Sequence, residues 1–181
     1  NDTYTFIEDQ NREYREENLV DSTFENLKIN FLLLFNKEGQ KVFTKGYDLD
    51  RENEVSIPQG LEEKLTPDSI LVTHEEVNSE AKGLLLLDNG FYLIASQPIL
   101  TSDREGPIRG SFIMGQKFDE KRLDSLKKRT QLELELIIYR INKLPEEFQK
   151  IGSELENLQQ INPLEPAIIA EPKDASTISG Y

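Results

Sequence analysis

Cysteine is absent from this sequence of 181 residues. The absence excludes disulfides, thiolate nucleophiles and thiolate metal sites. A chain without cysteine suits either the cytosol or an extracellular face where no disulfide is needed, so the count leaves the compartment open. Stability must come from packing, and the chain is long enough to bury a core of its own as one domain.

Long apolar runs are missing as well. No stretch approaches the roughly 18 apolar residues that a membrane-spanning helix needs, and no signal peptide is visible. The chain opens at Asn1 without an initiator methionine. This beginning suggests a piece excised from a longer protein.

Basic residues are few relative to acidic ones, with 21 Lys and Arg against 34 Asp and Glu, for a net charge of -13. Such a field repels phosphate backbones and anionic headgroups, so we expect no nucleic-acid partner. Hydrophobic residues make up 36% of the chain, which is too much for a disordered segment. The composition indicates a globular domain.

Motifs of catalysis are also scarce. The single histidine, His74, lacks the second histidine of a metalloprotease motif, and we expect it in a loop. No P-loop and no Gly-x-Ser-x-Gly motif occurs. Asp48, Asp50 and Glu52 resemble the start of a calcium loop, but its sixth and twelfth positions would be Asn53 and Gln59, which favours a solvated acidic loop. We therefore expect no cofactor, no metal and no catalytic residue.

The hydrophobic pattern predicts an α+β domain. Residues 1–27 are expected to be helical, and residues 48–80 form a crossover of loops and short helices. The Asn89-Gly90 step predicts a tight hairpin. Five strands are expected at 29–35, 42–47, 84–87, 91–99 and 108–117. Pairing of the last strand beside the first would give an antiparallel sheet of order 2-1-5-4-3, a PAS-like or Cache-like architecture.

The C-terminal part is expected to begin with a charged helix capped by Asp119 and running to about residue 128. Alternation of leucine and glutamate over 132–136 predicts a further strand, 145–158 a helix and 162–171 an extended segment. We assign residues 1–141 to the domain core and its N-terminal helices. Residues 142–181 are then a C-terminal extension of the same module, truncated at a strand entrance.

Several short blocks resemble the fourth type of CHASE domain, a PAS-like or Cache-like extracellular sensory domain of membrane-bound histidine kinases and cyclases. The blocks are Asp2-Thr3-Tyr4 with Phe6, 21–27, 46–49, Gly83-Leu84, 96–99 and, most specifically, Gly106-Pro107-Ile108-Arg109-Gly110-Ser111-Phe112-Ile113-Met114-Gly115. The resemblance implies a sensor of a small-molecule ligand or a protein stimulus at the extracellular or extracytoplasmic face. It also implies a homodimer in the parent protein, tied to the membrane only through flanking helices beyond both ends.

Two other functions stay open at this point. A cytosolic interaction scaffold of profilin-like or longin-like topology would bind a protein and no small ligand. A hydrolase would need two carboxylates close together in a cleft, and no motif singles out such a pair. A hydrophobic segment directly before Asn1 in the full gene would favour the sensor over the scaffold.

Polar residues on the expected strands are the candidates for a ligand pocket between the sheet and the crossover. They are Tyr47, Tyr92, Ser96, Arg109 and Ser111. Arg109 could hold a carboxylate in bidentate geometry. The alternative is that the tyrosines belong to the core and that Arg109 pairs with a surface acid. A structural role is expected for Asp2 and Tyr4, which would pin the first helix to the sheet, and for Pro98, Gly110 and Gly115.

Overall fold

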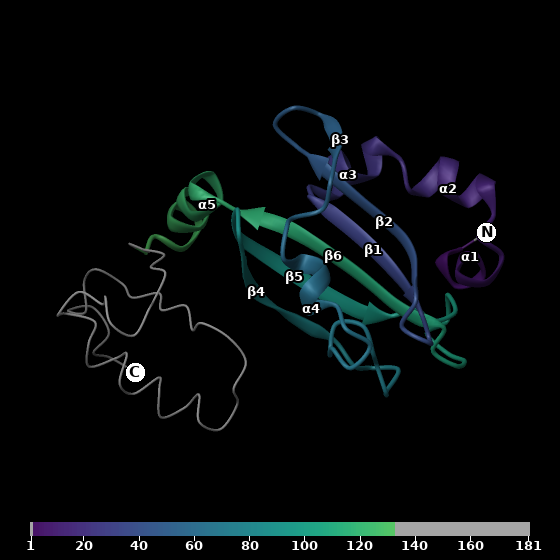
Figure 1. Ribbon diagram of the computed structural model, residues 1–181. Coiled ribbons are helices and arrows are strands. Elements are labelled where there is room, and N and C mark those ends of the chain that lie inside the picture. Colours follow the sequence, from purple (N-terminus) through teal and green to yellow (C-terminus); the bar gives the residue numbers. More distant parts are fainter. Residues whose placement is uncertain (1, 133–181) are drawn as a thin grey trace, which may run out of the picture. The chain divides into compact units, whose positions relative to one another are not determined.

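A six-stranded antiparallel sheet is the centre of the first of two units in the chain (Figure 1). The computed structural model describes residues 2–132, which divide after Phe118. The strands are β1 (Phe31–Asn36), β2 (Lys41–Asp48), β3 (Asn53–Val55), β4 (Ala81–Leu87), β5 (Gly90–Pro98) and β6 (Gly110–Phe118). Their order is β3-β2-β1-β6-β5-β4. The predicted order is therefore confirmed for the five longer strands, and β3 adds an edge strand that the sequence did not predict.

Alternation of side chains along β1 divides the core between the two faces of the sheet. Phe31 and Leu33 point to one face, and Leu32 and Leu34 point to the other. All four side chains are at most 1% exposed. A central strand that is buried on both faces explains why β1 reads as a continuous apolar run without alternation.

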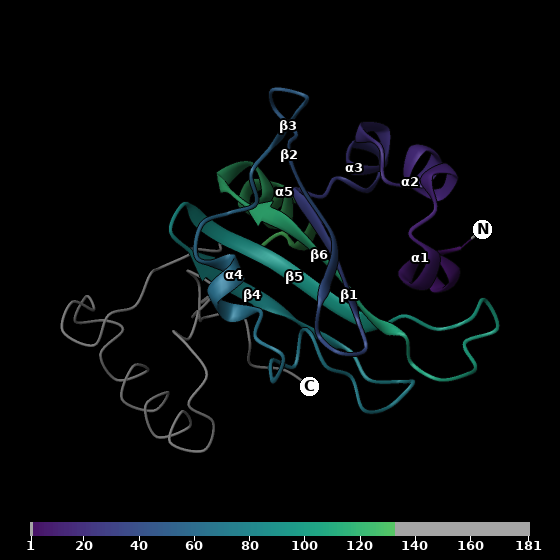
Figure 2. The same ribbon diagram turned by 45° about the vertical axis from the view of Figure 1, so that its right-hand side comes forward.

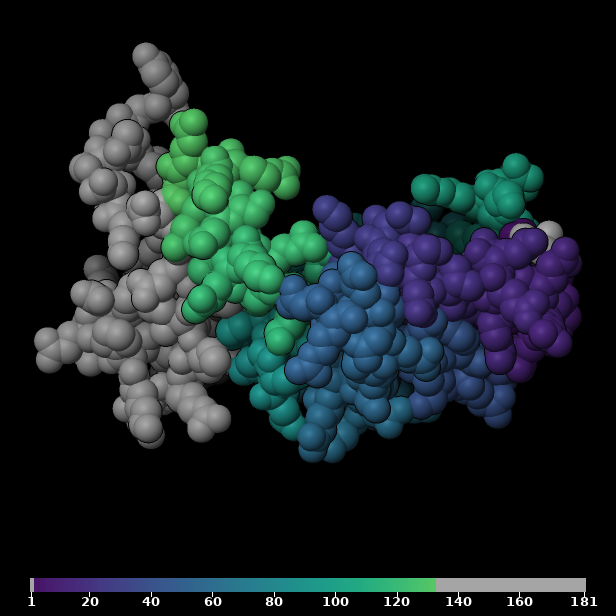
Figure 3. Space-filling model, turned by 90° about the horizontal axis from the view of Figure 1, so that it is seen from above, coloured from purple at the N-terminus to yellow at the C-terminus, as the bar shows by residue number. Residues whose placement is uncertain are grey.

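Three short helices cover one face, which we call the helical face (Figure 2). They are α1 (Thr3–Asp9), α2 (Arg12–Asn18) and α3 (Asp21–Leu27). The Asp2 carboxylate caps α1 by accepting from the Thr5 amide. Phe6 and Phe24 are fully buried against this face. The helices pack on side chains of β1 and β2, and in Figure 3 their purple surface adjoins the blue surface of the residues that follow in the chain.

The crossover between β3 and β4 covers the opposite face, which we call the crossover face. It contains one short helix, α4 (Leu61–Lys64), and otherwise consists of turns. Leu61, Leu65 and Val72 are buried against Phe31 and Leu33. The predicted mixture of loops and short helices is confirmed here.

Two glycines of β6 allow close approach between strands. Gly115 pairs with Phe31 across the sheet, and a Cβ at Gly115 would lie 1.9 Å from the Phe31 ring. Gly110 has φ +152, and a Cβ there would lie 1.8 Å from the Phe35 carbonyl oxygen. Gly115 is therefore required because a side chain would collide with the Phe31 ring, and Gly110 because its backbone conformation and the nearby Phe35 carbonyl exclude a Cβ.

The second unit is described only over its first residues. Helix α5 (Glu120–Thr130) begins after Asp119, whose carboxylate accepts from the Arg122 amide as a cap. This confirms the predicted capped helix. The predicted strand at 132–136, the segments beyond it and the boundary at residue 141 lie outside the described residues. Over residues 2–132 no helix is long and apolar enough to cross a membrane.

Candidate ligand-binding site

The structure separates the five predicted ligand-binding residues. Tyr92, Ser96 and Ser111 lie on the crossover face, because they share the alternation of Ile94 and Ile113. Tyr47 lies on the helical face. Arg109 directly precedes β6 and turns toward α1. No single pocket therefore brings the five together.

Tyr47 holds α3 on the sheet. Its ring is 1% exposed and lies 5.6 Å from the Phe24 ring, centroid to centroid. Its hydroxyl donates to the Glu25 carboxylate at 2.5 Å, and this hydrogen bond raises the pKa of Tyr47 well above its ordinary value. The contacts are those of a core tyrosine with a satisfied hydroxyl.

Tyr92 is likewise part of the core. It is 3% exposed, and its ring lies 5.6 Å from the ring of Phe31. Burial raises the pKa of the Tyr92 hydroxyl. The ring therefore helps to fill the crossover face beside the Phe31 ring, which occupies the space over Gly115.

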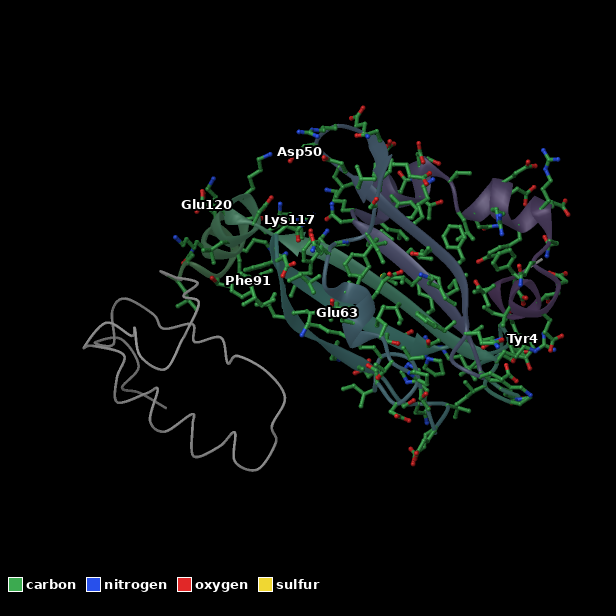
Figure 4. The ribbon with its side chains drawn as sticks, in the orientation of Figure 1. Tyr4, Asp50, Glu63, Phe91, Lys117 and Glu120 are labelled. Carbon is green, nitrogen blue, oxygen red and sulfur yellow. The ribbon has the colours of Figure 1, made fainter. Side chains whose placement is uncertain are left out.

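Arg109 fastens α1 to the sheet. Its guanidinium lies 3.7 Å from the centroid of the Tyr4 ring and donates from Nη1 to the Tyr4 carbonyl at 2.8 Å. Its Nε lies 3.2 Å from Oε1 of Glu8. The Tyr4 hydroxyl donates to the Pro107 carbonyl at 3.3 Å. We call Tyr4, Glu8 and Arg109 the α1 clamp, and Figure 4 shows Tyr4 at the end of the sheet where β6 begins.

Asp2 contributes to the same fastening from the start of the helix. Its carboxylate accepts from the Thr5 amide at 2.9 Å, and this hydrogen bond lowers the pKa of Asp2. Together with the clamp, the cap fixes both the beginning of α1 and its seat on the sheet. The structural role of Asp2 and Tyr4 stays a prediction, and the cap and the clamp are the contacts through which they would exert it.

Ser96 belongs to a polar network that the sequence did not predict. Its hydroxyl donates to the Leu71 carbonyl at 2.6 Å and lies 2.9 Å from Nε2 of His74. Nδ1 of His74 lies 2.8 Å from the Ser79 hydroxyl. The network ties the end of the crossover to the C-terminal part of β5, and burial lowers the pKa of His74.

Ser111 differs from Ser96 although both are buried serines of the crossover face. It is fully buried between Phe35 and Pro98 on the adjoining strands. Its hydroxyl has no hydrogen-bond partner among the described residues. Burial of a hydroxyl without a hydrogen-bond partner costs free energy, so the Ser111 hydroxyl is expected to destabilise the folded state.

Two open cavities lie near these residues. One has a volume of about 360 Å³ and is lined by 77–80 of the crossover, 97–98 of β5 and residues of the 100–104 loop. We call it the loop pocket. The other, of about 490 Å³, lies beside the α1 clamp and is lined by residues of α1, the 36–38 turn and 107–109. The two cavities use opposite ends of the connection between β5 and β6.

Metal ligands do not gather in the part of the chain that the structure covers. Among residues 2–132 no three His, Asp or Glu side chains are placed to hold an ion. The Asp48 carboxylate instead accepts from the backbone amides of Asp50 and Arg51, at 3.0 and 3.1 Å. The acidic segment after β2 is therefore a turn that closes on its own backbone.

The sequence matches the CHASE4 domain over residues 1–137. The chain belongs to the CHASE4 family. A curated relative, the methanogenesis regulatory histidine kinase FilI of Methanothrix harundinacea (strain 6Ac), is 28% identical over 136 residues. That match covers 75% of this chain but only 15% of the kinase. The CHASE4 domain described here is thus a sensory domain of the kind found in histidine-kinase-like proteins, and it spans a small part of the length of that relative.

Solved structures with some likeness to this CHASE4 domain include a domain of a sensory box/GGDEF family protein from Vibrio parahaemolyticus. It is 13% identical, with a TM-score of 0.46, and the match covers 87% of this chain and 70% of that one. The extracellular domain of the histidine kinase vpHK1S-Z8 is 16% identical, with a TM-score of 0.44, and the match covers 88% and 64% of the two chains.

Proposed function

We propose that this CHASE4 domain is the extracytoplasmic input domain of a transmembrane signalling protein such as a sensor histidine kinase. The observation that carries the proposal is the family match over residues 1–137, three quarters of the chain. The relative with a matching segment is itself a histidine kinase. In the parent protein we expect the domain to work as a homodimer joined to the membrane through flanking helices.

The stimulus in this proposal is a small molecule that binds beside the sheet and changes the seat of the N-terminal helices. Two cavities adjoin the connection from β5 to β6, and this connection also carries the Arg109 arm of the α1 clamp. A ligand that favours one arrangement of this connection would shift the position of α1 by population shift. The helix would then pass the change toward the membrane.

The placement outside the cytoplasm can be tested by labelling, because this chain has no cysteine of its own. In the parent protein, Arg51→Cys would put a thiol at a side chain that is 80% exposed. A membrane-impermeant maleimide should label it in intact cells, and the parent without the added cysteine gives the background. Labelling only after permeabilisation would overturn the extracytoplasmic placement and favour the cytosolic scaffold.

Ligand binding is tested by thermal shift of this chain against small carboxylates, amines, amino acids and metal ions. A ligand at a hundred times its dissociation constant adds about 2.7 kcal/mol to the folded state. A shift from one chemical class is expected. If no class shifts the melting temperature, the small-molecule stimulus is refuted and a protein stimulus takes its place, while the labelling result still decides the placement.

A further inference from the structure

The loop pocket has the lining of a site for a small polar molecule. Asn78, Gln97 and Ser102 offer neutral hydrogen-bonding groups, whereas the hydroxyls of Ser79 and Thr101 already donate to the Glu76 and Glu105 carbonyls. Its volume of about 360 Å³ lies at the lower end of the range for small-molecule sites. Neutral donors and acceptors in such number favour a ligand that carries several oxygen or nitrogen atoms.

Arg104 is the cation of this pocket, and its guanidinium forms no hydrogen bond or ion pair with any residue from 2 to 132. Other arginines are engaged: Arg12 pairs with Glu16, Arg51 with Asp48, and Arg109 with Glu8. Arg15, Arg122 and Arg129 likewise form no ion pair among residues 2–132, so what distinguishes Arg104 is its place in the lining of the loop pocket. The free fork of donors suits a carboxylate, which it can bind in bidentate geometry.

Hydrogen bonds within the turn fix the backbone on either side of Arg104. The Thr101 hydroxyl donates to the Glu105 carbonyl at 2.8 Å, and the Glu105 amide donates back to that hydroxyl at 3.1 Å. The Arg104 amide donates to the Thr101 carbonyl at 2.9 Å, and Arg104 has φ 58. A loop closed in this way loses little freedom when a ligand binds, which favours affinity.

The acid of the pocket, Glu80, is already engaged by Lys82 at 2.5 Å. An amine on the ligand would have to share this carboxylate, whereas a carboxylate meets an unoccupied guanidinium. The Arg104 guanidinium is therefore the charged group of the pocket that lacks a counter-ion, and a negatively charged ligand would supply it. A hydroxyl or amine on the same ligand would find the neutral groups and Glu80 within the lining.

The pocket also connects to the α1 clamp through Gly106. A Cβ built at Gly106 would lie 3.4 Å from the Thr101 methyl group and 3.4 Å from the Tyr4 hydroxyl. Thr101 lines the pocket, and Tyr4 is stacked on Arg109 in the clamp. A ligand that moves Arg104 and Thr101 therefore also moves Gly106, which lies beside the Tyr4 side chain of α1.

We propose that the loop pocket binds a small organic carboxylate through Arg104 and that the 101–106 loop transmits its binding to α1. This inference rests on the proposed sensory function and deepens it, because it names the site and the chemical class of the stimulus. The carboxylate could belong to a hydroxy acid or to an amino acid. The two kinds of ligand differ at Glu80, because the amine of an amino acid would pair with the Glu80 carboxylate and a hydroxy acid has no such group.

The test is calorimetric titration of the whole chain with lactate, malate, alanine and glutamate, beside the matched amides lactamide and alaninamide. At least one carboxylate should bind, with its amide weaker by tenfold or more. Arg104→Gln should lower that affinity by tenfold or more, because it removes the charged hydrogen bonds to the carboxylate. Arg51→Gln is the control and should leave the affinity unchanged. Glu80→Gln should weaken only an amino-acid ligand.

Hydrogen exchange gives the second readout. The bound carboxylate should slow exchange of the α1 amides, and Gly106→Ala, with strain at φ +88, should break this link. A carboxylate whose affinity survives Arg104→Gln would overturn the site, and so would the absence of carboxylate binding. In either case the maleimide labelling of the parent, which does not depend on the ligand, shows whether the sensory placement still holds.

Discussion

Removal of the Arg109 guanidinium should release α1 while the sheet stays folded. The side chain of Arg109 is 26% exposed, so its interactions are only partly screened. The charged hydrogen bond to the Tyr4 carbonyl contributes about 1.5–3 kcal/mol, and the stacking on Tyr4 about 0.5–1 kcal/mol. The pair with Glu8, which is 64% exposed, adds little. These contributions sum to about 2–4 kcal/mol, and the partial exposure of Arg109 reduces the total to about 2–3 kcal/mol.

This energy holds the helix locally, so Arg109→Ala should speed exchange of the α1 amides by about 30- to 160-fold. The amides to follow are those of Phe6 and Gln10, which donate to the carbonyls of Asp2 and Phe6. The assay is hydrogen exchange followed by NMR or mass spectrometry at constant pH. Exchange from β1 and β6 should not change.

Arg51→Ala is the matched control, because its side chain is 80% exposed and its nitrogen lies 3.7 Å from Asp48. It should leave α1 exchange as it is. Unchanged α1 exchange in Arg109→Ala would refute the clamp. An equal rise over helix and sheet would also refute it, since that result would make Arg109 a determinant of global stability.

Three further changes test the packing of the sheet. Gly115→Ala puts a Cβ 1.9 Å from the Phe31 ring and should lower the free energy of unfolding, measured by chemical denaturation, by about 3 kcal/mol. The control is Gly83→Ala, whose Cβ would have no atom within 4 Å, and which should be neutral or stabilising. An equal loss of stability at both sites would contradict the packing argument. Ser111→Ala removes a buried hydroxyl that has no hydrogen-bond partner among the described residues. It should raise the melting temperature and stabilise the fold by about 1 kcal/mol. A lower melting temperature would show that the hydroxyl has a hydrogen-bond partner after all. Burial lowers the pKa of His74 below its ordinary 6.5, so as the pH falls the unfolded chain binds the proton before the folded chain does, and the free energy of unfolding decreases below pH 6.5. His74→Gln should therefore show a smaller decrease than the unsubstituted chain when unfolding is measured at pH 7.5 and at pH 5.5.

Local sequence patterns were sufficient for most of the fold. The Asn89-Gly90 turn and the apolar strands beside it predicted the β4–β5 hairpin, which the structure shows with Leu87 paired to Gly90. Asp119 predicted the start of α5 in the same way. These signals depend on the conformations and caps that a few neighbouring residues allow, so they can be read without knowledge of the rest of the chain.

Strand β3 and the site could not be read in this manner. The residues of β3 are all exposed, so they carry no apolar alternation, and they become a strand only because β2 offers its edge. Arg104 and Arg109 look alike in the sequence. What separates them is whether an acid far along the chain arrives beside them, as Glu8 does for Arg109.

By itself, the sequence determined the five longer strands, the helix that Asp119 caps and the family, because hydrophobic periodicity, turn chemistry and caps act over a few residues. Tertiary structure decided which polar groups are used up and which stay available. The contacts from His74 to Ser96 and from Tyr4 to Arg109 join residues 22 and 105 positions apart. Such contacts depend on how the sheet brings distant segments together, and this is why the Arg104 pocket emerged only from the structure.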